Sequence, residues 1–213
     1  AKYFSDVLHQ IAISNNILSF YSISYYVKAR IKILENNISL ANSYYDSTIK
    51  YASFSVKKDI RYWTQKKKYY LLSDKFKLIF VDSLLDDSSY NYSFKAWLAL
   101  KKRRLLDKLD LRVVFLDSII KSENWPSIEK SDLFYSLAID QTDMGDFKNG
   151  IMSLDSCLNL RKIILQNDSS KTNIRDYANT LTVIGTVYAD LARKLSNIDE
   201  VKKNCNEALF YCE

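Results

Sequence analysis

Few residues in this chain could carry catalysis or hold a ligand, and they are scattered. His9 is the one histidine, so any histidine-containing triad, dyad or metal site would depend on it. It lies in an uncharged amphipathic stretch, which favours an ordinary, partly buried histidine. Gly145, Gly150 and Gly185 are too sparse for a phosphate-binding loop, and Gly145 is expected in a turn between helices. The sequence predicts no metal site and no cofactor.

Two pairs of carboxylates are close enough in sequence to share a site, Asp86 with Asp87 and Asp140 with Asp143. A carboxylate pair becomes catalytic when burial shifts the pKa of one member. Exposed acids at helix ends are the simpler interpretation, and the chain is expected not to be an enzyme.

The composition and the spacing of apolar residues both indicate helices. The 213 residues include three Gly and one Pro, whereas strand-rich folds need many tight turns that use them. Apolar residues recur every three or four positions from Val27 to Ala52, as in an amphipathic helix, and Asn36-Asn37 predicts a break into two helices. Two further helices are expected at Tyr92–Leu106 and Asp110–Lys121. The uncharged stretch from Val7 to Val27 is too polar to span a membrane.

The clearest break in the sequence is Asn124-Trp125-Pro126-Ser127, which predicts two regions, 1–126 and 127–213. Residues 1–110 hold 19 Lys and Arg against 10 Asp and Glu, a net charge of +9, and residues 111–213 have a net charge of −3. The first region is expected to form basic, tyrosine-rich helical hairpins. Both regions are expected to belong to one continuous solenoid.

A repeated pattern of small and large apolar residues follows that break. Its first copy consists of Leu137-Ala138, Gly145-Asp146-Phe147, Gly150, Leu154, Cys157 and Leu158. Its second copy consists of Leu181, Ile184-Gly185, Tyr188, Val201, Cys205, Ala208 and Leu209. Two helices can approach closely where a side chain is nearly absent, so each copy predicts a pair of packed helices.

This pattern resembles the tetratricopeptide repeat family, whose unit is a helical pair of about 34 residues. The resemblance covers residues 131–213, and within them the tract Arg161–Leu165 together with Arg175–Ala178 resembles the longer-helix variants of bacterial signalling and nucleotide-switch proteins. The chain departs from the family in its spacing, since Ala138 and Gly185 lie 47 residues apart. The resemblance implies an all-α, right-handed superhelix of antiparallel helix pairs. We expect four or five hairpins in the chain, and those before residue 131 are predicted from apolar periodicity alone.

The resemblance also implies a place for a partner, because in this family the first helices of successive pairs line a concave surface. The matching positions are polar with one tyrosine, which suits a protein or peptide partner. They are Asp132, Tyr135, Ile139, Asp143, Asn179, Thr182, Thr186 and Asp190. The expected function is a recognition or sensing module, the regulatory or scaffold part of a larger signalling protein.

A basic patch in the first region offers an alternative function, binding to nucleic acid or to another anionic surface. It consists of Lys66, Lys67, Lys68, Lys101, Lys102, Arg103 and Arg104. The simpler interpretation is that these residues face water while the tyrosines form the core. A small-molecule sensor with a pocket between helices is a third hypothesis. Three sparse cysteines favour a reducing compartment, so a cytoplasmic protein is expected.

Overall fold

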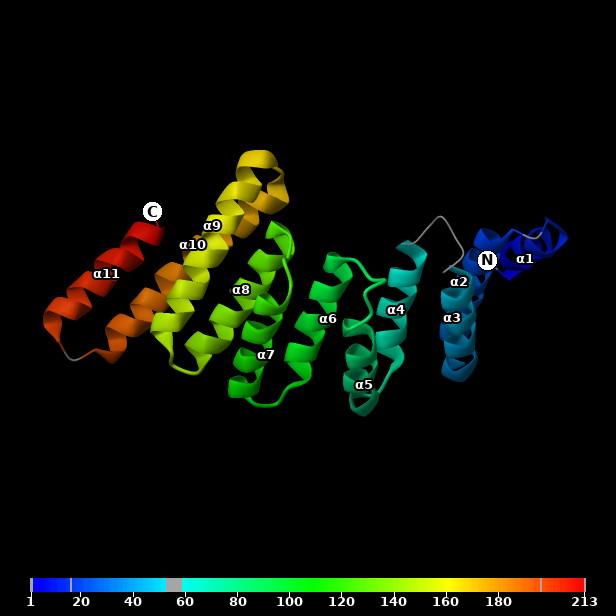
Figure 1. The fold of residues 1–213 in the computed structure, drawn as a ribbon, viewed down its shortest axis with the longest axis horizontal. Helices are drawn as coiled ribbons and strands as arrows, with labels where there is room; N and C mark the ends of the chain where they lie inside the picture. The colour runs from blue at the N-terminus through cyan, green and yellow to red at the C-terminus, as the bar shows by residue number, and fades with distance from the viewer. Residues whose placement is uncertain (1, 16, 53–58, 196, 213) are drawn as a thin grey trace. The chain divides into compact units, whose positions relative to one another are not determined.

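The structure is a computed structural model that describes residues 2–15, 17–52, 59–195 and 197–212. Helices and the turns between them account for these residues, and no strand occurs among them, which confirms the all-α prediction. The helices are α1 (Lys2–Asn15), α2 (Leu18–Leu34), α3 (Ile38–Ala52), α4 (Asp59–Leu71), α5 (Asp74–Leu85), α6 (Tyr92–Leu105), α7 (Leu109–Ser122), α8 (Ser127–Asp143), α9 (Phe147–Asn167), α10 (Lys171–Lys194) and α11 (Ile198–Cys212) (Figure 1).

Residues that tolerate unusual backbone angles separate α2 from α3 and α8 from α9. Asn36 has a φ of 57° just after α2, in the left-handed region that asparagine enters more readily than most residues. The side chain of Asn37 then accepts a hydrogen bond from the N–H of Leu40 at 3.1 Å and caps α3. Gly145 has a φ of 86° after α8. The predicted break at Asn36-Asn37 and the predicted turn at Gly145 are both confirmed.

Contacts between residues divide the chain into two compact units, Ala1–Phe80 and Val81–Glu213. The segment from Asn124 to Ser127 lies within the second unit, where Trp125 joins a core made by α6, α7 and α8. The boundary between the compact units, after Phe80, therefore differs from the boundary predicted at residue 126. The boundary at residue 126 stays a prediction about sequence regions.

In the first unit, small residues and tyrosines make the core. Tyr51 stacks on Tyr21 and Tyr25, with ring centroids 5.1 and 5.7 Å apart. Tyr45 is fully buried, and burial raises its pKa to about 12. Three alanines are also fully buried and allow close approach of the helices that carry them: Ala12, Ala29 and Ala41. Several tyrosines of the basic region thus pack inside the fold.

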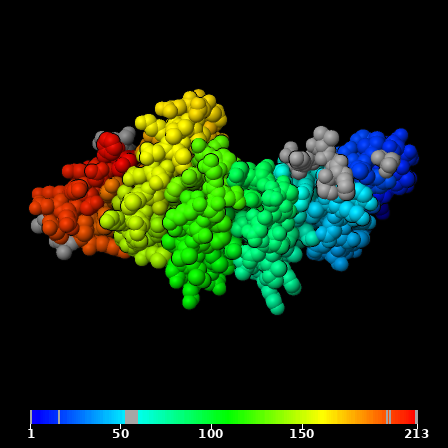
Figure 2. Space-filling model, in the orientation of Figure 1, coloured from blue at the N-terminus to red at the C-terminus, as the bar shows by residue number. Residues whose placement is uncertain are grey.

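In the second unit, α8 contributes to two neighbouring clusters of buried side chains. The first cluster joins α6, α7 and α8 through Ala96, Ala99, Leu116, Ile120, Trp125, Leu133 and Leu137. The second joins α8, α9 and α10 through Ala138, Leu154, Ile184 and Val187. Figure 2 shows side chains closing the space that the ribbons leave between α8 and α9.

The four helices α8, α9, α10 and α11 lie side by side in chain order (Figure 1). A glycine sets the approach of α8 and α9, since a Cβ at Gly150 would lie 2.5 Å from Cγ2 of Thr142 and 3.4 Å from the carbonyl oxygen of Ala138. These helices match the two copies of the repeated pattern, α8 with α9 and α10 with α11. A right-handed superhelix running through the whole chain stays a prediction.

Candidate functional site

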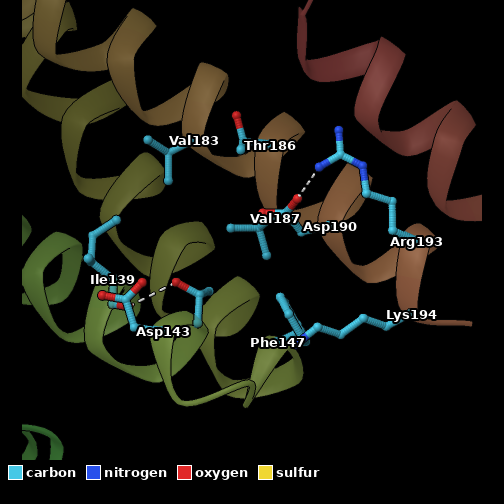
Figure 3. Close-up of a pocket in the computed structure, with 10 residues that line it drawn as sticks. Ile139, Asp143, Phe147, Val183, Thr186, Val187, Asp190, Arg193 and Lys194 are labelled. Carbon is cyan, nitrogen blue, oxygen red and sulfur yellow. Dashed lines mark hydrogen bonds and ion pairs between the residues drawn. The ribbon is translucent and has the colours of Figure 1, made fainter. Parts of the chain in front are cut away.

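A groove with a volume of about 450 Å³ lies between α8 and α10, near the start of α9 (Figure 3). We call it the α8–α10 groove. Its apolar residues are Ile139, Phe147, Val183 and Val187. Its polar and charged residues are Thr142, Asp143, Thr186, Asp190, Arg193 and Lys194.

Helical spacing explains why these side chains share one groove. Ile139 and Asp143 lie four residues apart on α8, and residues four apart share one face of a helix. Val183 and Val187 are related in the same way on α10. The fully buried Ile184 holds α10 against α8 and α9. The packed core thus positions the two walls of the groove.

The charged residues of the groove carry both signs. Nη1 of Arg193 donates a hydrogen bond to Oδ1 of Asp190 at 2.8 Å, and both side chains are largely exposed. Nζ of Lys194 lies 4.6 Å from the ring centroid of Phe147, a cation–π contact that Figure 3 shows as two side chains meeting. Asp143 is exposed, and within the described ranges its carboxylate has no ion pair. The groove therefore offers a free acid, a basic side chain and an apolar floor.

The structure brings together only part of the predicted concave surface. Four of its eight residues line the α8–α10 groove: Ile139, Asp143, Thr186 and Asp190. Asn179 and Thr182 are exposed on α10 but lie outside the groove lining. The remaining two, Asp132 and Tyr135, contact Arg161 instead. A role for these residues in binding stays a prediction.

Arg161 on α9 contacts residues of both α8 and α10. Its partners on α8 are Asp132 and Tyr135. Its Nη1 donates to the carbonyl oxygen of Asp176 and to Oγ1 of Thr180, both at 2.6 Å. Its Nη2 donates to Oδ1 of Asp132 at 3.2 Å, and its guanidinium lies 4.9 Å from the ring centroid of Tyr135. Burial raises the pKa of Asp132, although Arg161 opposes that shift. These contacts position α8, α9 and α10.

Sequence reasoning missed Arg161, and it also missed several residues of the groove. The signal for Arg161 was its place in an apolar stripe, four residues after Cys157 and three before Ile164. A basic residue on a buried helix face usually has a partner that the helix alone does not reveal. Val183 lies three residues before Thr186 and Val187 lies one residue after it. Their positions beside Thr186 on one helix could have indicated that they line the same groove.

One expectation about the acidic residues was wrong. Asp140 is fully buried, not exposed at a helix end. Its two carboxylate oxygens accept hydrogen bonds from Nε and Nη2 of Arg103 at 2.6 and 2.7 Å, the two-pronged geometry that suits arginine. The pair joins α6 to α8, so Asp140 acts in the structure as a partner of Arg103. Asp143, by contrast, is exposed as expected.

His9 is partly buried, as predicted. Its Nδ1 lies 3.0 Å from Oγ of Ser24, and its ring meets Tyr21 and Tyr25 edge-on at 5.5 and 5.0 Å. Burial lowers the pKa of His9, and the nearby Lys28 adds to that effect. The lowered pKa favours the neutral ring, and the contacts are those of a packed side chain.

Cys157 is a poor candidate for a nucleophile. It is fully buried, and burial raises the pKa of its thiol, which disfavours the reactive thiolate. Its Sγ lies 3.9 Å from Oγ1 of Thr180 on α10. Cys157 therefore packs between α9 and α10.

The basic patch lies partly in α4, at Lys66–Lys68, and partly in α6, at Lys101–Arg104, and these helices belong to different compact units. Several residues of the patch have carboxylate partners, among them Lys68 with Asp46, Lys102 with Asp82, and Arg103 with Asp140. Those partners reduce the charge that the patch can offer to phosphate groups. Binding of nucleic acid through the patch stays a prediction.

Two further features are absent from the described part of the chain. None of its helices is long and apolar enough to cross a membrane. Among the same residues, no group of three or more His, Cys, Asp and Glu side chains is placed to hold a metal ion.

Comparison with known proteins does not assign the chain to a family. No protein-family model and no curated protein matches the sequence. A solved structure described as "MamA RS-1 ArsTM double mutant" is similar at 10% sequence identity, with a TM-score of 0.48, over 90% of this chain and 94% of that chain. A likeness this distant carries no argument about function, so the similarity to tetratricopeptide repeats remains a resemblance of motifs.

Proposed function

We propose that this chain is a protein- or peptide-recognition module that binds its partner in the α8–α10 groove. The observation that carries the proposal is the composition of the groove, an apolar floor beside charged residues of both signs. Burying apolar surface supplies binding energy of roughly 25 cal/mol per Å², and a few polar groups orient what is bound. A short peptide with an apolar side chain between charged ones matches that pattern.

The arrangement of helices supports the same proposal. In a tetratricopeptide-like solenoid, α8 and α10 are the first helices of successive pairs, and a groove between first helices belongs to the concave surface. The buried Ala138 lies where the motif places a small residue for close packing. We therefore propose a tetratricopeptide-like arrangement for α8–α11. Such a recognition function would serve a regulatory or scaffold role in a larger signalling protein.

We also propose that the chain binds its partner without catalysing a reaction. The packing of His9 among tyrosines and the raised pKa of the Cys157 thiol support this. Asp140, the buried member of the acidic pair, is held by Arg103.

A matched pair of threonines on α10 provides the test. Thr182 and Thr186 are both exposed, and each hydroxyl donates to the carbonyl oxygen four residues earlier, at 3.1 and 2.9 Å. Only Thr186 lines the groove. Peptides selected from a random phage-displayed library on the wild-type chain should bind Thr186→Arg at least about tenfold more weakly, as expected for a blocked binding centre. They should bind Thr182→Arg like the wild type.

A second substitution addresses the other wall. Asp143→Lys reverses the free acid on α8, and a cation at the last turn of a helix is favourable, so the fold should tolerate it. It should weaken the selected peptides as well. Peptides that bind both groove variants as tightly as the wild type would contradict the proposal.

The same titrations include a single-stranded oligonucleotide at several salt concentrations. Binding that falls steeply with salt, and that is lost when Lys66, Lys67 and Lys68 are replaced by Glu, would move the function to the basic patch. Peptide binding by the groove should depend less on salt.

A further inference from the structure

A second groove, with a volume of about 620 Å³, lies on α10 and α11. We call it the α10–α11 groove. Small and apolar residues make most of its lining, among them Gly185, Ala189, Val201, Cys205, Ala208 and Leu209. Leu209 is 61% exposed there, so a large apolar side chain faces solvent beside small ones. Cys205 is exposed as well, and Ala189, Val201 and Ala208 are half-buried, whereas Gly185 at the base of the groove is buried. Two neighbouring helices thus share an apolar surface that solvent reaches in part.

The repeated pattern shows which surface of the preceding helix pair corresponds to this groove. In the two copies, Gly185 takes the place of Ala138, Cys205 that of Leu154, and Ala208 that of Cys157. All three second-copy residues line the α10–α11 groove. The groove is therefore the counterpart of a defined face of α8 and α9.

In the first pair that face is covered, and α10 is the helix that covers it. Ala138 and Leu154 are fully buried in one cluster with Ile184 and Val187 of α10. Cys157 contacts Thr180, also on α10. Thr180, Ile184 and Val187 follow the i, i+4, i+7 spacing of one helix face. The molecule itself thus shows what fits such a face, an amphipathic helix.

We propose that the α10–α11 groove binds an amphipathic helix of a partner protein, packed as α10 packs on α8 and α9. The counterparts of the three residues that α10 covers are each smaller: glycine replaces Ala138, cysteine replaces Leu154 and alanine replaces Cys157. Close packing leaves no large voids, so the bound helix must supply the missing volume. Its stripe carries larger side chains than α10 does, such as Leu, Met or Phe at i, i+4 and i+7.

The test uses α10 as the starting sequence for the probe. A fluorescent peptide of residues 171–194 with Thr180, Ile184 and Val187 replaced by Leu presents the larger stripe. The unmodified peptide presents the native stripe, and a third peptide has Ser at the three positions. By fluorescence anisotropy against the full chain, the Leu peptide should bind about tenfold or more tightly than the unmodified one, and the Ser peptide weakest. Equal binding of the Leu and Ser peptides would overturn the proposal.

Adjacent residues of α11 give the matched protein variants. Leu209 and Phe210 are both exposed, at 61% and 72%, and only Leu209 lines the groove. Leu209→Asp should weaken the Leu peptide about tenfold or more, whereas Phe210→Asp should not. Circular dichroism of both variants should match the wild type, because neither side chain is in the core. A peptide that displaced the chain's own α10 would bind both variants equally, and that result would contradict the assignment.

Alkylation of Cys205 reports occupancy directly. In a Cys212→Ser background, the exposed Cys205 should react with a maleimide several-fold more slowly once the Leu peptide is bound, while Cys157 stays buried. Asp143 lines the α8–α10 groove and not this one, so the Asp143→Lys variant should show the same protection of Cys205. The two proposals can therefore fail independently, one for the α8–α10 groove and one for the α10–α11 groove. If the wild type instead sediments as a dimer and Leu209→Asp as a monomer, a second copy fills the groove and the partner-helix proposal is wrong.

Discussion

The helix pairs α8–α9 and α10–α11 follow one sequence pattern, yet corresponding residues have different environments. Leu154 is fully buried, while its counterpart Cys205 is exposed. Leu158 is half-buried, and its counterpart Leu209 is 61% exposed. The cause is the next helix, since α10 covers the face of the first pair. The same position in a helical repeat becomes core or surface according to its neighbour.

The acidic residues of α8 and α10 extend this comparison. Asp140 on α8 is fully buried against Arg103, whereas the pair of Asp190 and Arg193 on α10 lies at the surface. Desolvation makes a buried charge dependent on its partner, while water stabilises an exposed one.

The largest effect that we expect comes from the two ion pairs. Asp140→Ala leaves the guanidinium of Arg103 without its carboxylate in a mostly buried place, and should lower the free energy of unfolding by about 3–5 kcal/mol. Asp190→Ala should change it by about 0–1 kcal/mol. Urea unfolding followed by circular dichroism measures both. Similar losses in the free energy of unfolding of the two variants would show that burial does not determine how much each ion pair contributes to stability.

The next effect concerns the corresponding residues of α9 and α11. Leu154→Ala removes a fully buried side chain and should cost about 2–5 kcal/mol of stability. Cys205→Ala, at the matching position of the second pair, should stay within about 0.5 kcal/mol of the wild type. The midpoints of urea unfolding give the comparison. A large loss in Cys205→Ala would mean that the α10–α11 face is covered in the isolated chain.

The smallest effect tests the approach of α8 and α9. Gly150→Ala adds a methyl group 2.5 Å from Cγ2 of Thr142 and should cost about 1–3 kcal/mol, offset in part by the better helix propensity of alanine. Thr142→Ser removes Cγ2 and keeps the hydroxyl that donates to Ile139. The double variant should therefore recover most of the loss in thermal unfolding. Failure to recover would place the clash at the carbonyl oxygen of Ala138.

Part of the candidate site could be predicted from sequence, because it depends on spacing along single helices. Ile139 and Asp143, and likewise Thr186 and Asp190, are four residues apart and face the groove together. Tyr135 was expected to anchor a partner, but it packs under Arg161. That contact joins residues from two helices, and spacing on one helix does not reveal it.

The sequence by itself determined the helical class, the break at Asn36-Asn37 and the turn at Gly145, since these depend on local propensity and periodicity. The tertiary structure alone decided that Asp140 is buried, that Arg161 holds three helices, and that Cys205 and Leu209 are exposed. The physical reason is that burial, ion pairing and desolvation depend on which helix packs beside a residue. The spacing of apolar residues by three and four positions determines which face of a helix is apolar. The neighbouring helix determines whether that face is buried or exposed.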